Sequence, residues 1–84
     1  MRWVYIPNIE FFIEKFGREC SSVYNPSNRN FNSVHAPGWN HHMTSMCGKF
    51  YKVESTSAYS FAIEDPVTNH TWTFRADWVI NITQ

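Results

Sequence analysis

The stretch from Met46 to Ile82 constrains the fold more than any other part of the chain, because it has the pattern of four short β-strands joined by tight connections. Its apolar and aromatic residues alternate with polar ones, as in strands that are buried on one face. The segment 65–70 has the chemistry of a turn, since Pro66 presets a corner and Asn69 tolerates a left-handed backbone. We expect strands over 49–55, 59–64, 71–75 and 78–82, with a very short break at 76–77.

The N-terminal part of the chain predicts one more strand and one helix. Residues 2–6 are rich in β-branched and aromatic side chains and stop at Pro7, which cannot donate a ladder hydrogen bond. Asn8 can cap a helix, and four apolar side chains follow it at helical spacing on one face. These are Ile9, Phe12, Ile13 and Phe16. We expect this helix to end at Gly17.

The middle of the chain loses its periodicity. Residues 18–23 predict a short strand or an extended segment, and 24–39 predict a long loop rich in Asn, Ser and Pro. A domain of this size seldom keeps so long a loop unless the loop has a task. Residues 41–47 predict a single helical turn with Met43 and Met46 facing inward.

The core of so small a protein needs only a few large side chains, and aromatic residues make up 18% of this chain. In each predicted strand the alternation selects the side chains that face inward. We expect the core to contain Phe50 or Tyr51, Phe61, Ile63, Trp72, Phe74, Val79 and Ile80.

Length and charge limit the classes of protein. A chain of 84 residues predicts a single domain, 1–84, because a second independent core would need about 40 residues of its own. Seven Lys and Arg balance seven Asp and Glu, so no net field attracts phosphate and nucleic-acid binding is disfavoured. The sequence has no secretory signal and no membrane-spanning run, so we expect a cytoplasmic protein whose Cys20 and Cys47 are free thiols.

The order of predicted elements resembles a Src-homology-3 (SH3) type barrel: a strand, a long decorated loop, three meandering strands, a one-turn break and a closing strand. More narrowly, residues 43–82 resemble very small barrel proteins encoded by bacteriophages, with a Met shortly before Gly-Lys and an aromatic-x-aromatic strand before an acidic residue. The matching residues are Met43, Gly48, Lys49, Val53, Trp72, Phe74, Asp77, Trp78 and Ile80. The resemblance covers about half the chain. It implies a mostly β fold, a small SH3-like, partly open β-barrel of about five strands with one short N-terminal helix.

Fold alone does not determine function, because barrels of this kind bind peptides, nucleic acids or other proteins. The resemblance implies a non-enzymatic protein that binds and blocks a host protein or protein complex in the host cytoplasm. Its sharper form is a phage inhibitor of a host defence system such as a CRISPR-Cas complex. A nucleic-acid-binding or peptide-binding adaptor module is the alternative.

Catalytic and metal sites are poorly supported by the residues. His41, His42 and Cys47 have ligand chemistry, but adjacent histidines project apart and no Cys-x-x-Cys pair is present. Nothing in the sequence orients a Cys-His pair for nucleophilic attack. We therefore expect no catalytic residues, no metal and no cofactor. A nucleic-acid surface would use Arg2, Arg18, Arg29, Lys49 and Lys52, but Phe50 and Tyr51 between the two lysines point to opposite faces of a strand.

Protein binding is the expected function, and the long loop with the following histidines is the expected contact surface. The predicted contact residues are Asn28, Arg29, Phe31, His35, Trp39, His41 and His42. Phe31, Val34 and Trp39 either pin the loop to the barrel or stand exposed for a partner. Replacing Arg29, Phe31 and His35 with Ala should weaken partner binding while leaving thermal unfolding nearly unchanged. Self-association into a homodimer through exposed strand edges is a further expectation.

Overall fold

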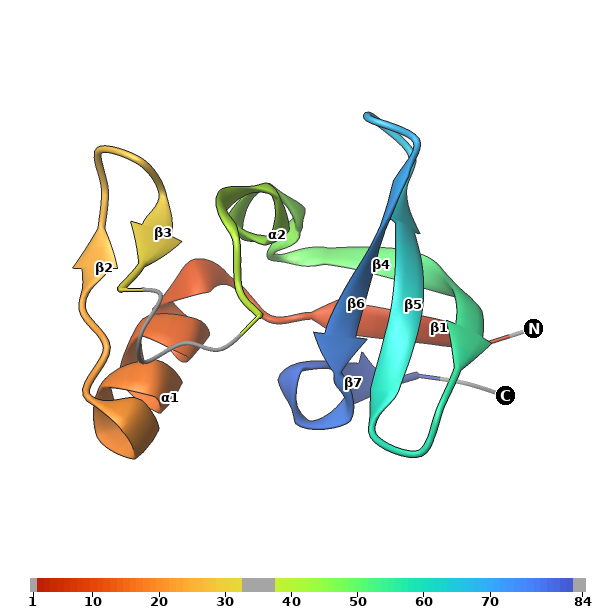
Figure 1. Cartoon of the computed structure of the whole chain (residues 1–84). Coiled ribbons are helices and arrows are strands. Elements are labelled where there is room, and N and C mark those ends of the chain that lie inside the picture. The colour runs from red at the N-terminus through yellow and green to blue at the C-terminus, as the bar shows by residue number, and fades with distance from the viewer. Residues whose placement is uncertain (1, 33–37, 83–84) are drawn as a thin grey trace. The chain divides into compact units, whose positions relative to one another are not determined.

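The computed structural model describes residues 2–32 and 38–82 (Figure 1). Its contacts divide the chain into two compact units, and each is described here by itself. The sheet unit comprises Met1–Pro7 and Gly48–Gln84, and the helical unit comprises Asn8–Cys47. The chain is mostly β with one main helix, as the sequence predicts. The prediction of a single domain stays a prediction.

The sheet unit contains five antiparallel strands and one 3₁₀ turn. Their order across the sheet is β6-β5-β4-β1-β7, so the sheet is open and β6 and β7 are its edges (Figure 1). The elements are β1 (Trp3–Ile6), β4 (Lys49–Thr56), β5 (Ser60–Asp65), β6 (His70–Arg75), η1 (Ala76–Trp78) and β7 (Ile80–Asn81). The strands predicted over 2–6, 49–55, 59–64 and 71–75 and the turn at 65–70 are therefore present, and Asn69 has the expected left-handed backbone with φ 61°.

The core of the sheet unit is apolar and contains part of the predicted set. The predicted residues Tyr51, Ile63 and Phe74 are buried, and Phe61, Trp72 and Val79 are half-buried. The prediction for Ile80 is wrong, because 51% of this side chain is exposed. Val4, Ile6 and Trp78 are also buried, although they were not in that set.

The last strand is shorter than predicted. Ala76–Trp78 forms the 3₁₀ turn, so Trp78 reaches the interior from this turn and not from a strand. Only Ile80–Asn81 pairs as a strand, with Ile80 opposite Tyr5. The prediction of a strand over 78–82 is therefore wrong for residue 78, which lies in the turn, and the paired strand is confined to Ile80–Asn81.

The helical unit begins with α1 (Ile9–Cys20), which Asn8 caps by accepting a hydrogen bond from the Phe11 amide at 3.4 Å. Of the four predicted apolar residues, Phe12 and Phe16 are buried along one face, whereas Ile9 is half-buried and Ile13 is exposed. Gly17 does not end the helix. The helix ends at Cys20 and is capped by Ser21, whose left-handed backbone (φ 56°) lets the Ser22 amide donate to the Phe16 carbonyl at 3.1 Å. The prediction of a short strand or an extended segment over 18–23 is wrong for its first half, because residues 18–20 belong to α1.

Gly17→Ala should raise the free energy of unfolding by about 0.5 to 1 kcal/mol, because alanine restricts the unfolded chain and favours the helix. The added methyl group would meet only the Ser22 carbonyl oxygen, at an ordinary contact distance of 3.8 Å. Chemical denaturation of the two proteins measures the change. A loss of stability would contradict it.

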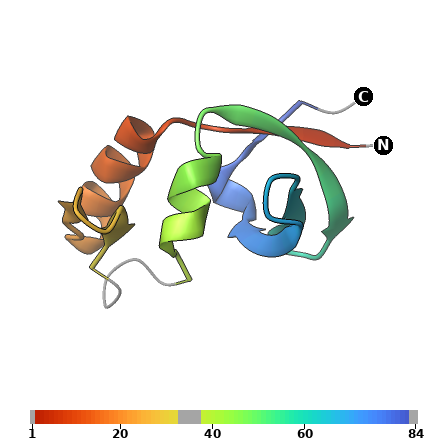
Figure 2. The same ribbon diagram turned by 90° about the horizontal axis from the view of Figure 1, so that it is seen from above.

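The predicted loop 24–39 is partly structured. It contains a small hairpin of β2 (Tyr24–Asn25) and β3 (Asn30–Phe31), which lies beside α1 (Figure 2). The helical turn predicted at 41–47 is confirmed as α2 (His41–Met46), with Met43 and Met46 buried. Residues 33–37 of the predicted loop lie outside the described part of the chain.

Candidate binding surfaces

The hairpin of the helical unit carries much of the predicted contact region. Its asparagines form local turns: Asn25 Oδ1 accepts from the Ser27 amide at 2.9 Å, and Asn28 Oδ1 accepts from the Asn30 amide at 3.2 Å. Arg29 completes the turn with a left-handed backbone at φ 53°. The high asparagine content of this segment is therefore explained by turn chemistry.

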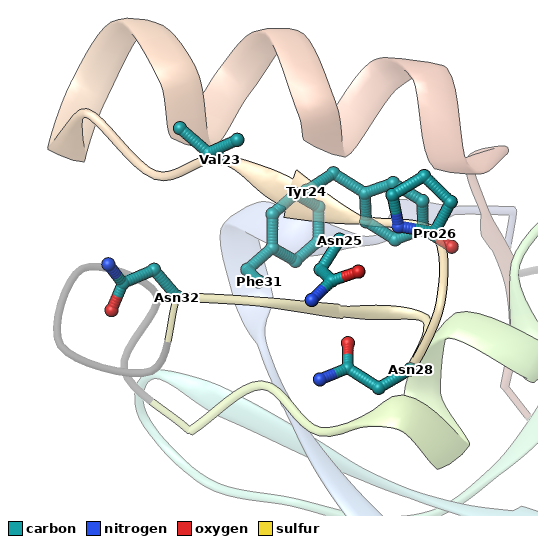
Figure 3. Close-up of a pocket in the computed structure, with 7 residues that line it drawn as sticks. All are labelled: Val23, Tyr24, Asn25, Pro26, Asn28, Phe31 and Asn32. Carbon is teal, nitrogen blue, oxygen red and sulfur yellow. The ribbon is translucent and has the colours of Figure 1, made fainter.

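A surface hollow of about 420 Å³ lies along this hairpin (Figure 3). The side chains of Asn25 and Asn28 project into the same space, and the rings of Tyr24 and Phe31 pack at 5.2 Å between centroids (Figure 3). The hollow is lined by Val23, Tyr24, Asn25, Pro26, Asn28, Phe31 and Asn32. It offers neutral amides and no charged side chain, so it has no group that would select a charged ligand.

Phe31 and Trp39 belong to the interior of the helical unit. Their side chains are 4% and 5% exposed, and their ring centroids lie 5.6 Å apart. Phe31 packs on Phe16 at 4.9 Å, and Trp39 packs on Phe12 at 4.7 Å. Both side chains therefore pack against α1, and neither offers an exposed ring to a partner. Because Phe31 is buried, the triple alanine variant would also lower stability.

Thr44 connects the hairpin to the rest of the helical unit. Its hydroxyl donates to the Arg29 carbonyl at 2.7 Å and accepts from Trp39 Nε1 at 2.9 Å. A residue in α2 thus holds both the tip of the hairpin and the buried indole. This bond holds the backbone of Arg29 at the hairpin turn.

The other predicted contact residues are partly accessible. Asn28, Arg29 and His41 are exposed, and His42 is half-buried with its ring 4.0 Å from that of His41. His35 lies outside the described residues. These positions stay predictions as contact residues. The exposed ones belong to two elements, the hairpin turn and α2.

Cys47 is a poor nucleophile in this fold. Burial, and to a smaller extent the negative charge of Glu10, raises the pKa of its thiol to about 12. Its Sγ lies 3.5 Å from the Met43 carbonyl oxygen, which accepts a weak hydrogen bond from the thiol. Within residues 2–32 and 38–82, no three His, Cys, Asp or Glu side chains gather as a metal site would require.

At pH 8, iodoacetamide should modify Cys47 about 1,000-fold more slowly in the folded protein than in the urea-unfolded chain. The thiolate is the reacting form, and a pKa of about 12 leaves far less of it than the ordinary value near 9. Because the thiolate forms by proton loss, the rate in the folded protein should rise about tenfold per pH unit towards pH 11. Peptide mass spectrometry separates Cys47 from Cys20. Equal rates in the folded and unfolded chains would contradict a raised pKa.

The outer face of the sheet unit holds exposed apolar side chains that the sequence reasoning missed. Tyr5 pairs with Phe50 on one side and with Ile80 on the other, so the three side chains form a row across β4, β1 and β7. Phe50 is 60% exposed and its ring centroid lies 4.9 Å from that of Tyr5. Trp3 and Ile82 form a second row, in which the Ile82 amide donates to the Trp3 carbonyl at 2.9 Å.

Both rows consist of large apolar residues that are exposed, except for Tyr5, which is half-buried. Trp3 is 44% exposed and Ile82 is 43% exposed, close to the value for Ile80. We call Trp3, Tyr5, Phe50, Ile80 and Ile82 together the aromatic face. The signal in the sequence was that residues 3–6 are apolar at every position, so both faces of that strand carry apolar side chains.

A groove of about 260 Å³ runs from the aromatic face across β4. Trp3 and Phe50 line its apolar part, and Glu54 and Glu64 line its acidic part. The full lining is Trp3, Phe50, Tyr51, Lys52, Val53, Glu54, Glu64 and Pro66, all within the sheet unit. The groove therefore combines apolar side chains with two carboxylates.

Comparison with known proteins finds no relative of this chain. No protein-family model matches the chain, and no curated protein or solved structure is significantly similar to it. In the part of the chain that the structure describes, no helix is both long and apolar enough to cross a membrane. The function has to be inferred from the surfaces themselves.

Proposed function

We propose that the protein is a non-enzymatic binding protein that acts by covering a surface of another protein. The aromatic face is the observation that carries this proposal. Large apolar side chains in a strand normally face the core, and an exposed group of them typically marks an interaction site. Aromatic residues are also enriched at the centres of protein interfaces.

The sharper form of the proposal is a phage-encoded inhibitor of a host defence system, such as a CRISPR-Cas complex, acting in the host cytoplasm. It rests on the sequence resemblance, together with an SH3-like, partly open barrel as the fold. Two features support that fold: the order of β1, inserted segment, β4, β5 and β6, and the 3₁₀ turn just before β7. A small protein that acts by binding and blocking another protein needs no cofactor.

The proposal is tested by titrating the purified protein into reconstituted CRISPR-Cas nuclease complexes at a fixed enzyme concentration. A binding inhibitor should suppress target cleavage in proportion to its own amount and saturate near equivalence. An enzyme that inactivates the complex would act far below equivalence, and that result would contradict a non-enzymatic mechanism. In cells, expression should restore plaque formation by a phage that the defence system targets. Unchanged plaque counts across a panel of systems would reject the defence-inhibitor form.

A single-stranded nucleic-acid-binding module is the second candidate, because Trp3, Tyr5 and Phe50 present three aromatic rings on one face of the sheet. Successive bases stack on such rings in many single-strand binders. Glu54 and Glu64 in the adjoining groove would repel the phosphate backbone, so we rank this candidate below protein binding.

A further inference from the structure

We propose that the groove beside the aromatic face binds an extended, basic segment of the partner protein. This inference rests on the proposed function and specifies the chemistry of the partner. A large apolar side chain of the segment occupies the part lined by Trp3 and Phe50, and a Lys or Arg side chain reaches Glu54 and Glu64.

The apolar part of the groove is formed by side chains that the backbone fixes in place. Trp3 and Phe50 lie on adjacent strands, where Trp3 pairs with Lys52 and Phe50 pairs with Tyr5. They point away from the core because Val4 and Tyr51, their neighbours in sequence, are buried. A partner side chain that covers them removes apolar surface from water without requiring the strands to move.

The acidic part is built by an irregularity in β4. Val53 pairs with Ile63 and Ser55 pairs with Ala62, so Glu54 is an extra residue at this point of the ladder. A β-bulge of this kind re-aims the side chain that it carries. The carboxylate of Glu54 accepts a hydrogen bond from the Thr71 hydroxyl at 3.4 Å, and Thr71 is opposite Glu64. Both glutamates therefore lie on the outer face, close to one another.

The charge of the groove selects its occupant. Two carboxylates and one ammonium group, that of Lys52, line it, so it attracts cations and repels phosphate. The volume of about 260 Å³ is below the range of about 300–1,000 Å³ typical of small-molecule sites, and it suits one or two side chains. An extended segment presents alternate side chains to one face, as this arrangement of an apolar and an acidic part requires.

The test uses the full-length protein and a fluorescein-labelled peptide in which Leu and Arg alternate with Ser, so that an extended backbone turns them towards one face. Fluorescence anisotropy gives the Kd. We expect the Glu54→Gln, Glu64→Gln double variant to weaken binding roughly three- to tenfold, because two exposed ion pairs are lost. Phe50→Ala should weaken it about tenfold, because apolar burial is lost. Lys52→Gln should strengthen it about twofold, because a repelling charge is removed.

Matched controls lie elsewhere on the surface. Glu14→Gln removes an exposed carboxylate from α1, and Tyr59→Ala removes an aromatic side chain that is 84% exposed. Neither should change the Kd. Peptides with Glu in place of Arg, or Ala in place of Leu, should bind more weakly to the wild-type protein. Equal affinity of the wild-type protein and the double glutamine variant would overturn the proposal.

Two other occupants are separate outcomes of the same experiment. If labelled oligo-dT binds, and the double glutamine variant binds it more tightly while Lys52→Gln binds it more weakly, the groove takes nucleic acid and the proposal fails. If sedimentation shows a stable dimer of wild-type chains that Phe50→Ala dissociates, a second copy covers the face and the proposal also fails.

The nuclease titration separates this inference from the proposed function. If the wild-type protein and the groove variants inhibit a nuclease complex equally well, the function stands and the groove is rejected as the contact. If the wild-type protein binds the basic peptide as expected but inhibits no complex, the groove stands and the function as a defence inhibitor falls.

Discussion

Trp39→Ala should lower the free energy of unfolding by about 3 to 5 kcal/mol, a large part of what so small a protein has. The indole is 5% exposed and lies within 4.7 to 5.6 Å, between ring centroids, of Phe12, Phe16 and Phe31. Removing it leaves a cavity among these rings and deletes the hydrogen bond to Thr44. Urea denaturation followed by circular dichroism measures the loss.

Tyr59→Ala is the control for that experiment. It also truncates a large aromatic side chain, but 84% of Tyr59 is exposed, so we expect a change within about 0.5 kcal/mol. If Trp39→Ala proved as mild as Tyr59→Ala, the packing of Trp39 against α1 would be wrong. The segment would then be open to partners, as the sequence-based alternative allowed.

Phe74→Ala should also cost about 3 to 5 kcal/mol, because the ring is fully buried and packs edge-on against Trp78 at 6.3 Å. Phe50→Ala is a matched control in the same sheet, since it removes the same atoms from a side chain that is 60% exposed. We expect Phe50→Ala to cost less than about 1 kcal/mol, mostly through its contact with Tyr5. Thermal unfolding by calorimetry compares the two.

The contrast between these two phenylalanines also tests the outer face. If Phe50→Ala destabilised the protein as much as Phe74→Ala, Phe50 would be a core residue and the aromatic face would not exist as a surface. The proposal of a docking groove would then lose its apolar part. A Phe50→Ala variant that loses peptide affinity but little stability would show that this side chain serves binding and not the core.

Local chemistry made most of the elements predictable. Asn8 signals the start of α1, Pro66 and Asn69 signal the turn between β5 and β6, and the spacing of Met43 and Met46 signals the buried face of α2. Each signal depends on a few neighbouring residues, so the sequence is enough to read it. The hairpin was missed because its strands are only two residues long, too short to show alternation.

Which side of a strand is buried was harder to predict when both sides carry apolar groups. Phe50 and Tyr51 are equivalent by pattern, and the choice depends on β1, which pairs with β4 from the other end of the sequence. Ile80 was predicted to face the core for the same reason, because the neighbouring sequence does not reveal that it pairs with Tyr5. The aromatic face and the groove arise from these long-range pairings, which the sequence alone does not reveal. The sequence therefore predicted a contact surface in the loop instead.

The insertion of the helical unit between β1 and β4 has a consequence for how the chain folds. About 40 residues separate the two strands, and closing a loop of that length costs roughly 3 kcal/mol of chain entropy beyond a constant. The Gly48 amide donates to the Pro7 carbonyl at 3.2 Å, so the two ends of the inserted segment lie close together in the folded protein. The same amide also donates to the Ile6 carbonyl at 2.7 Å, where the strands meet. Early formation of the inserted unit would turn a distant strand pairing into a nearly local one, so the rate at which the sheet assembles should depend on aromatic residues that lie outside it.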